Sequence, residues 1–372
     1  MANRMVNKKA FTKKRIVMYL FILLLLGGAI YKMMRDEPDM IESSDVIWKY
    51  LKDNPETTSL YVAQDGEELI TYQSDVVRPL ASVVKIVVAL EYAMQIEEGK
   101  IDQNMVVQLD ELSRYYVEGT DGGAHEAWVS NLEPNKEVTL HEAAKGMILY
   151  SSNANTDFLI DLLGANAINN RLKNIGIIQH EEIYPIVGAL FISNYIKKEH
   201  TEEQLIEELT NMPIDSYRAL AMELSGKLKD GTIQSNDIGD ISLDVQRVWS
   251  DRLTGSSASE YGKLLSTISR DEFSPVVTEV LRDLLEWPME LHESNRELFA
   301  HFGAKGGSTA FVLNQAMYVE NKDGQKVELV IMIDDLSMED GTLVYENFDS
   351  FIFSMLTNEE YREKVSKDLY ES

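Results

Sequence analysis

Hairpin patterns near both ends of the chain constrain its fold more than any other feature. Each pattern is a pair of strand-like runs around a turn that contains Asp-Gly, a sequence typical of β-hairpins. The paired runs are residues 60–63 with 69–72 and residues 309–320 with 326–334. Helical patterns dominate between them, so we expect one antiparallel sheet made from both hairpins, flanked by helices, with an all-helical subdomain beside it. The sequence therefore predicts an α+β fold.

The expected helices share an apolar face or a capping residue at the start. They cover residues 44–51, 83–95, 139–149, 155–163, 201–209, 257–268, 276–285 and 345–356. We expect the folded domain to span residues 43–372, with its helical part at about 83–270 and a charged tail after the last helix. Residues 36–42 look like a short polar linker.

The first 35 residues differ in composition from the rest of the chain. They hold eight basic side chains and no acidic one, and residues 16–31 between them are uncharged. Six of the cations precede this apolar run, so the positive-inside rule predicts a cytoplasmic tail, a single-pass membrane anchor through residues 16–31, and a domain outside the cell membrane. The alternative is a cleaved signal peptide, but no clear A-x-A site follows the run.

Charge and composition exclude several classes of function. The chain has 62 acidic and 35 basic side chains, a net charge of −27, which is opposite to the basic surface that a nucleic acid requires. Cysteine is absent, which excludes disulfides, thiol catalysis and zinc–cysteine sites. The six histidines show no ligand spacing. We expect no nucleic-acid partner, no metal and no cofactor.

The first stretch that could carry chemistry is Ser82-Val83-Val84-Lys85, which follows Pro79 and begins a predicted helix. Lys85 is three residues after Ser82, so both side chains lie on one helix face. A desolvated lysine loses its proton more readily and could act as a base for the serine hydroxyl. Taken alone, the pattern favours the alternative of a capping serine and an unrelated surface lysine.

Two further stretches offer polar groups in turns. Ser151-Ser152-Asn153 lies between two predicted helices and provides a hydroxyl and an amide, or simply a helix cap. Lys305-Gly306-Gly307-Ser308 enters the first strand of the late hairpin, where glycines permit close approach of a ligand, or simply form a turn. The glycine-rich residues 119–123 lack the Gly-Lys-Ser/Thr of a phosphate loop, and we expect them beside a cleft.

Together and in this order, the three stretches resemble the S-x-x-K, S-x-N and K-x-G elements of the penicillin-recognising serine enzymes, specifically class A β-lactamases and their serine-hydrolase relatives. The resemblance covers most of residues 43–356. Residues 139–148 resemble the family's helix before the S-x-N turn, and Phe273-Ser274-Pro275 resembles the start of the helix before the K-x-G strand. This implies a β-lactamase/transpeptidase-like fold with its site in the cleft between an α/β part and an all-α part.

The resemblance also implies roles for individual residues. Ser82 would be the acylated nucleophile and Lys85 its base partner. Ser151 would pass a proton to the leaving nitrogen, with Lys305 tuning it. The oxyanion hole would be the backbone N–H groups of Ser82 and Ser308.

Implied substrate contacts come from the S-x-N turn, the K-x-G strand and an aromatic at the cleft rim. They are Asn153, Gly306, Gly307, Ser308, and Tyr115 or Tyr116, although both tyrosines could equally be packing residues.

The sequence departs from the family pattern at two places. Hydrolytic members carry a glutamate followed four residues later by asparagine, which activates the deacylating water. No glutamate between 160 and 200 has this neighbour here; Glu181 or Glu182 could substitute, or could lie in a solvated turn. Gly306 stands where the family usually has Thr or Ser, a loss for which Ser308 or Thr309 could compensate.

Three hypotheses follow from complete acylation machinery and doubtful deacylation. The first is a surface serine hydrolase of β-lactamase type that acts on β-lactams or related amides and esters. The second is a D-alanyl-D-alanine carboxypeptidase-like enzyme that acts on peptidoglycan-type peptides. The third is a penicillin-binding sensor ectodomain that is acylated without turnover.

Overall fold

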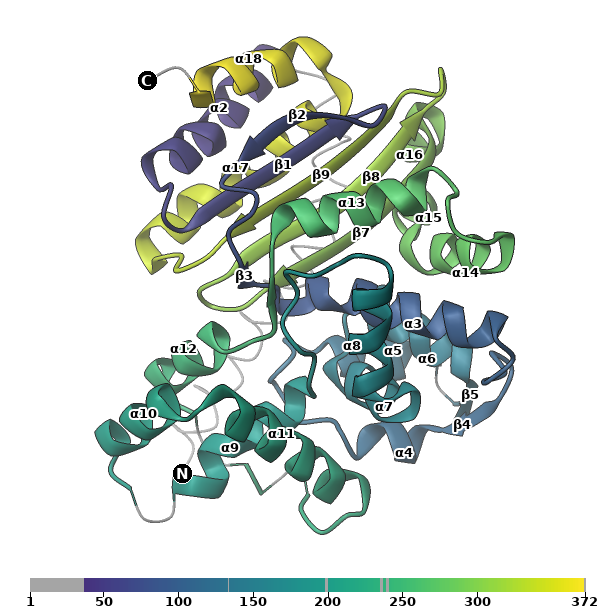
Figure 1. Ribbon diagram of the computed structural model, residues 1–372, viewed down its shortest axis with the longest axis vertical. Helices are drawn as coiled ribbons and strands as arrows, with labels where there is room; N and C mark the ends of the chain where they lie inside the picture. The colour runs from purple at the N-terminus through teal and green to yellow at the C-terminus, as the bar shows by residue number, and fades with distance from the viewer. Residues whose placement is uncertain (1–36, 133, 198–199, 235–236, 239–240, 371–372) are drawn as a thin grey trace.

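The structure is a computed structural model, and it describes residues 37–132, 134–197, 200–234, 237–238 and 241–370. The strands of its main sheet are β1 (Thr58–Gln64), β2 (Glu67–Tyr72), β7 (Phe299–Ser308), β8 (Leu313–Asn321) and β9 (Lys326–Ile333). They are antiparallel and lie in the order β2-β1-β9-β8-β7 (Figure 1). Both predicted hairpins are confirmed, and pairing of β1 with β9 joins them into one sheet.

Strand β7 at the edge of the sheet is not among the predicted strands. It contains Lys305–Ser308, which were expected to lead into the strand at 309–320. That next strand, β8, begins only at Leu313, after a turn in which the hydroxyl of Thr309 accepts the amides of Phe311 and Val312. The K-x-G residues are therefore part of a strand whose position is fixed by pairing with β8 along its length.

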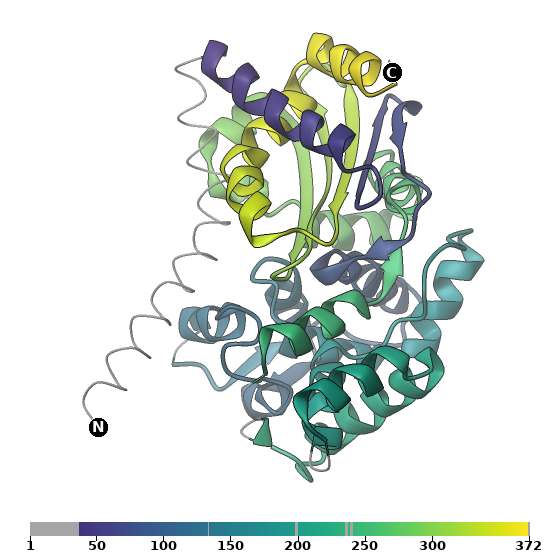
Figure 2. The same cartoon turned by 90° about the vertical axis from the view of Figure 1, so that its left-hand side faces the viewer.

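One face of the sheet is covered by helices from both ends of the chain (Figure 2). These are α2 (Glu37–Asp53), α17 (Met338–Thr357) and α18 (Glu359–Tyr370). Since α2 begins at Glu37, residues 37–42 are helical rather than the expected linker. The expected charged tail forms α18, which buries Tyr361, Val365 and Leu369 against this core.

The other face of the sheet packs on α13 (Ala258–Ser269) and, at β7, on α14 (Pro275–Leu285). Below it in Figure 1 lies the helical part, centred on α3 (Lys85–Glu97), whose apolar residues are buried on all sides. The helices around α3 include α6 (Leu140–Ile148), α7 (Asn153–Leu163) and α8 (Ala165–Asn174). Ser82 is three residues before the start of α3, and it therefore lies at the junction of the sheet and the helical part.

A second helical core lies between α8 and α13 in the sequence. It is built from α9 (Ile186–Ile196), α10 (Glu202–Asn211), α11 (Ile214–Lys229) and α12 (Leu243–Asp251). Only α10 is among the predicted helices, and Thr201 caps it as expected. The remaining short elements are β3 (Arg78–Pro79), η1 (Ala81–Val84), β4 (Val106–Gln108), α4 (Leu109–Ser113), α5 (Ala124–Leu132), β5 (Glu137–Thr139), β6 (Gly255–Ser256), α15 (Pro288–Leu291) and α16 (Glu293–Leu298).

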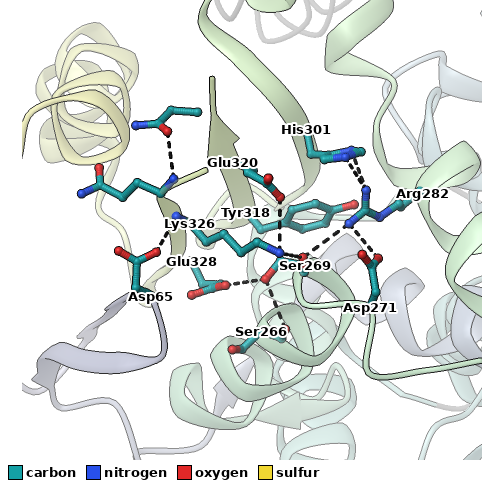
Figure 3. A network of polar contacts seen from close by, with 12 residues as sticks. Asp65, Ser266, Ser269, Asp271, Arg282, His301, Tyr318, Glu320, Lys326 and Glu328 are labelled. Atoms are coloured by element: carbon teal, nitrogen blue, oxygen red, sulfur yellow. Dashed lines mark hydrogen bonds and ion pairs between the residues drawn. The ribbon is translucent and has the colours of Figure 1, made fainter. Parts of the chain in front are cut away.

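A polar network ties β7 and β9 to the helices beneath them (Figure 3). The guanidinium of Arg282 on α14 donates to the ring of His301 on β7 and pairs with Asp271 at 2.8 Å. On the same sheet face, Glu328 of β9 accepts the hydroxyl of Ser269 at 2.5 Å. The Arg282–His301 contact and a bond from the Trp287 indole to the Ala304 carbonyl, at 2.9 Å, hold the strand that carries Lys305.

Every helix among the described residues is either too short or too polar to span a lipid bilayer. The predicted anchor at residues 16–31 lies outside the described residues.

Candidate active site

Ser82 lies in η1, a short turn between β3 and α3. Pro79 pairs with Gly255 of β6, and the amide of Leu80 donates to the carbonyl of Thr254 at 3.0 Å, which fixes the chain entering the turn. Ala81 takes φ +47°, a conformation that residues with a Cβ rarely adopt. This turn makes Ser82, which is partly exposed, the second residue of η1, three residues before Lys85.

The side chain of Lys85 is fully buried and reaches all three residues of chemical interest. Its Nζ lies 2.9 Å from the Oγ of Ser82, 2.8 Å from the Oδ1 of Asn153 and 3.1 Å from the Oγ of Ser151. It also lies 2.6 Å from the carbonyl of Ser151. A neutral amine has two hydrogens and one lone pair, so it can donate to the Ser151 carbonyl and Asn153 while accepting the proton of Ser82.

The electrostatic surroundings favour this neutral form of Lys85. Burial is the largest cause that holds the pKa of Lys85 well below its usual value of 10.5, and the charge of Lys305 acts in the same direction. Asp121 and Asp157 oppose the shift in the pKa. A lysine in this environment can take a proton from a serine hydroxyl near neutral pH.

The S-x-N turn joins the two lysines. The Oγ of Ser151 accepts a hydrogen bond from Lys305 Nζ at 3.0 Å, and Ser151 itself has φ +66°. Ser152 caps α7 by accepting the amide of Asn155 at 3.2 Å, so the structural interpretation of this stretch also holds. Ser151 and Asn153 therefore lie on either side of a capping residue and face Lys85.

The K-x-G stretch completes the cluster from the edge strand. Lys305 is almost fully buried, and burial lowers its pKa to about 7. Its Nζ also donates to the carbonyl of Gly306 at 2.8 Å. A Cβ at Gly307 would lie 2.7 Å from the carbonyl oxygen of Leu80 and from the amide nitrogens of Ser82 and Val83, so a glycine permits the strand to approach the serine this closely.

Three distant stretches of the sequence thus converge on one cluster: Ser82 and Lys85, Ser151 and Asn153, and Lys305 with its glycines. The structure therefore brings together the residues to which the resemblance assigns the nucleophile, the base, the proton relay and the substrate amide contact. The arrangement can activate Ser82 for attack on a carbonyl carbon and return a proton to a leaving group.

The two tyrosines considered for the cleft rim make packing contacts with neighbouring rings. Tyr115 is buried against α7, where its ring packs edge-on against Phe158 and its hydroxyl donates to Asp161 at 3.4 Å. Tyr116 stacks on the ring of His125 with centroids 4.7 Å apart. The contacts of Tyr115 are those of a packing residue, the alternative that the sequence left open.

The two glutamates considered for deacylation lie beside β6 and are exposed at the surface. The carboxylate of Glu181 accepts the amide of Gly255 at 3.1 Å and pairs with Arg218 at 3.5 Å. The Glu182 carbonyl accepts the hydroxyl of Thr254 at 3.5 Å. After them the chain enters α9, whose first residues are apolar and buried. The carboxylate of Glu181 is thus engaged in structural contacts.

Two neighbours of Gly306, Ser308 and Thr309, were considered as replacements for the missing hydroxyl. The Thr309 hydroxyl is engaged with Ser250 at 2.6 Å and with the turn before β8. Ser308 is partly exposed, at the end of β7. Over Gly306 itself lies the side chain of Gln315, whose Oε1 would be 2.8 Å from a Cβ at that position. Of the two residues considered from the sequence, Ser308 is the one whose hydroxyl is not part of that turn.

Sequence reasoning missed two buried carboxylates beside the cluster. Asp157 accepts the amides of Ile186 and Val187 at 2.7 and 2.8 Å, and burial raises its pKa to about 7. The sequence does contain a signal for this residue: Asp157 is four residues after Asn153, so both lie on the same face of α7. Asp121 lies in the glycine-rich loop at 119–123, and nothing in its local sequence indicates that it approaches Lys85.

Comparisons with solved structures show a shared fold. TLA-3 extended-spectrum β-lactamase matches with a TM-score of 0.51 at 14% identity, over 86% of this chain and 100% of that one. A β-lactamase from Sphaerobacter thermophilus DSM 20745 matches with a TM-score of 0.51 at 14% identity, over 82% and 95%. A mutant of PBP-A, solved as an acyl-enzyme complex with penicillin G, matches with a TM-score of 0.50 at 16% identity, over 84% and 95%.

No curated protein matches the sequence. The model of the β-lactamase enzyme family matches residues 42–372, which is most of the chain and includes every residue of the cluster. The resemblance noted in the three signature stretches and the β-lactamase-like α+β fold are both confirmed. The chain therefore belongs to the β-lactamase enzyme family, whose fold it shares.

Proposed function

We propose that this protein is a serine hydrolase that forms an acyl-enzyme on Ser82 with β-lactams or related amides and esters. The observation that carries the proposal is the 2.9 Å contact between Ser82 Oγ and the buried Nζ of Lys85, with Ser151 bridging to Lys305. A serine hydroxyl beside a desolvated amine is an activated nucleophile.

The reaction proceeds in two stages. Ser82 Oγ bonds to the substrate carbonyl carbon while its proton passes to Lys85 Nζ, and the oxyanion is held by the amides of Ser82 and Ser308. The C–N bond then breaks, and the leaving nitrogen takes a proton from the Ser151 hydroxyl, which is reprotonated by a lysine ammonium. Water later cleaves the ester, releasing the free acid and restoring Ser82.

The engagement of Glu181 supports slow release of the acyl group. Its carboxylate is bound to the Gly255 amide and to Arg218 rather than to a residue of the cluster around Lys85. This favours, as a second candidate, a penicillin-binding protein that acts on D-alanyl-D-alanine peptides, with β-lactams as slowly released acylating agents. Release of D-alanine from such a peptide distinguishes it from a β-lactamase.

Intact-mass spectrometry after exposure to penicillin G tests the acylation. We expect a mass increase of one penicillin per chain, mapped to Ser82, that persists while a chromogenic cephalosporin gives a burst of about one equivalent. Ser82→Ala should abolish the adduct, whereas Ser113→Ala, at an exposed serine of α4, should keep it. Absence of an adduct in the wild-type chain, or its persistence in Ser82→Ala, contradicts the proposal.

We also propose that residues 16–31 anchor the domain on the outer face of the cell membrane. The support is the charge asymmetry around this uncharged run, with six of eight cations before it. Fractionation and protease treatment of intact cells test this. The chain should remain with the membranes after a salt wash, and external protease should degrade its domain. Recovery of the domain in the soluble fraction contradicts a retained anchor.

A further inference from the structure

The glycine-rich loop at residues 119–123 carries a buried carboxylate for which the mechanism above gives no role. The side chain of Asp121 is only 8% exposed, although it lies in a loop between helices. Gly122 and Gly123 have φ of +70° and +90°, so the loop takes a path that residues with a side chain rarely follow. This path turns Asp121 inward, toward the S-x-N turn.

Asp121 connects two helix starts. Its Oδ1 accepts the amides of Gly123 at 3.2 Å and Ala124 at 3.1 Å, and its Oδ2 accepts the amide of His125 at 3.2 Å, all at the beginning of α5. The backbone N–H of Asn153, the first residue of α7, lies close enough to this carboxylate to lower its pKa. The Oδ1 of Asn153 in turn lies 2.8 Å from the Nζ of the base, Lys85. Asn153 therefore links the carboxylate of Asp121 to Lys85.

The charges that act on Asp121 or on Lys85 come from four elements. Lys85 on α3 and Glu126 on α5 act on Asp121, while Lys305 on β7 and Asp157 on α7 act on Lys85. His125, also on α5, is buried, and burial lowers its pKa to about 4, so it is neutral at physiological pH. Burial raises the pKa of Asp121, and Lys85 and the amide donors oppose this change.

We propose that Asp121 is a positioning residue for the acylation of Ser82, which holds Asn153 in register with Lys85 and presents a fixed negative charge to the base. This rests on the proposed function. The contact with the backbone N–H of Asn153 sets the geometry, and the negative charge of Asp121 opposes the lowering of the Lys85 pKa by burial and by Lys305. Without that charge, Lys85 would be a weaker base that is deprotonated at lower pH.

Asp121→Asn tests the role of the negative charge, because the amide oxygen of asparagine can still accept some of the hydrogen bonds that the carboxylate accepts. We expect the acid limb of the pH–rate profile for acylation, measured with a fluorescent penicillin, to move to lower pH by on the order of one unit. The plateau rate should fall at the same time, because Lys85 is less basic. A purely structural role would lower the rate at every pH and leave the limb where it is.

Ser274→Ala is the matched control, since Ser274 caps α14 by accepting the amide of Val277 at 3.3 Å, away from Lys85. It should lower the melting temperature without moving the limb. If Asp121→Asn acylates with an unmoved limb, the inference is wrong while the proposed function stands. If the wild-type chain forms no adduct at any pH, the proposed function is wrong.

A direct measurement keeps the inference testable without substrate and without a stable variant. In the full wild-type chain, carbon-13 NMR of the Asp121 carboxyl and the Lys85 Cε should show Asp121 ionised throughout the range in which Lys85 titrates. A carboxyl that remains protonated across that range overturns the inference, whether or not Ser82 is acylated by penicillin.

Discussion

The Cα of Gly307 approaches Ser82 so closely that a Cβ would lie 2.7 Å from the serine amide nitrogen. Backbone atoms of Leu80 and Val83 would lie at the same distance from this Cβ. All three neighbours are backbone atoms, so none can move aside as the end of a flexible side chain could. We expect Gly307→Ala to push β7 away from η1 and to lower the acylation rate about 100-fold or more, as loss of an oxyanion donor does. Stopped-flow acylation with a fluorescent penicillin measures this.

Gly306→Ala provides the comparison for this prediction. A Cβ there meets the Oε1 of Gln315 at 2.8 Å, which is the end of a flexible side chain and can move. Its effect on acylation should therefore be much smaller than that of Gly307→Ala. Equal losses in the two variants would show that the close approach of Gly307 to Ser82 is not needed for reaction.

Replacing Lys85 removes the base that the geometry assigns to Ser82. We expect Lys85→Met to lower the acylation rate about 100- to 10,000-fold, the usual contribution of a general base. Lys145→Met, at a half-exposed lysine of α6 that pairs with Asp283 at 3.0 Å, should acylate at the wild-type rate. Near-normal acylation of Lys85→Met would transfer the role of base to another group.

Local sequence could predict the residues of this cluster but not all of the elements that carry them. Spacing placed Ser82 and Lys85 on one helix face and capping placed Ser152 at the start of a helix, but only the three stretches taken together indicated a site. Strand β7 was missed because its glycines at 303, 306 and 307 give it little strand propensity. It forms through pairing with β8 and packing on α14, which are tertiary effects.

Two other features depended on contacts that a linear pattern does not contain. Helix α9 is buried along most of its length, and its continuous apolar run lacks the periodicity that marks a helix at a surface. Asp121 meets Asn153 only because the loop before α5 folds back onto the S-x-N turn. The resemblance to a family could supply roles for matching residues, and it could not supply a role for a residue outside the motifs.

The buried charge of Lys305 should lower the stability of the folded protein. Its pKa of about 7 is below the unfolded value of 10.5, so unfolded chains bind more protons between these values and stability rises with pH across that window. Lys305→Met should raise the free energy of unfolding by on the order of 2 to 5 kcal/mol below pH 7, while abolishing acylation. Denaturant unfolding at pH 6 and pH 9 measures this, and the gain over wild type should shrink at pH 9. A gain that is equal at both pH values would show that Lys305 carries no buried charge.

Glu181 should contribute to local structure rather than to release of the acyl group. Its side chain is 43% exposed and pairs with Arg218 at 3.5 Å, so Glu181→Gln should cost about 1 kcal/mol of stability or less. The deacylation rate of the penicillin adduct, followed by intact-mass spectrometry, should remain close to that of the wild-type chain. A base that activates the deacylating water would lose about 100-fold or more on the same change. A loss of that size in Glu181→Gln, with no such loss in Glu182→Gln, would identify Glu181 as the water-activating group and would require it to leave Arg218 in the acylated protein.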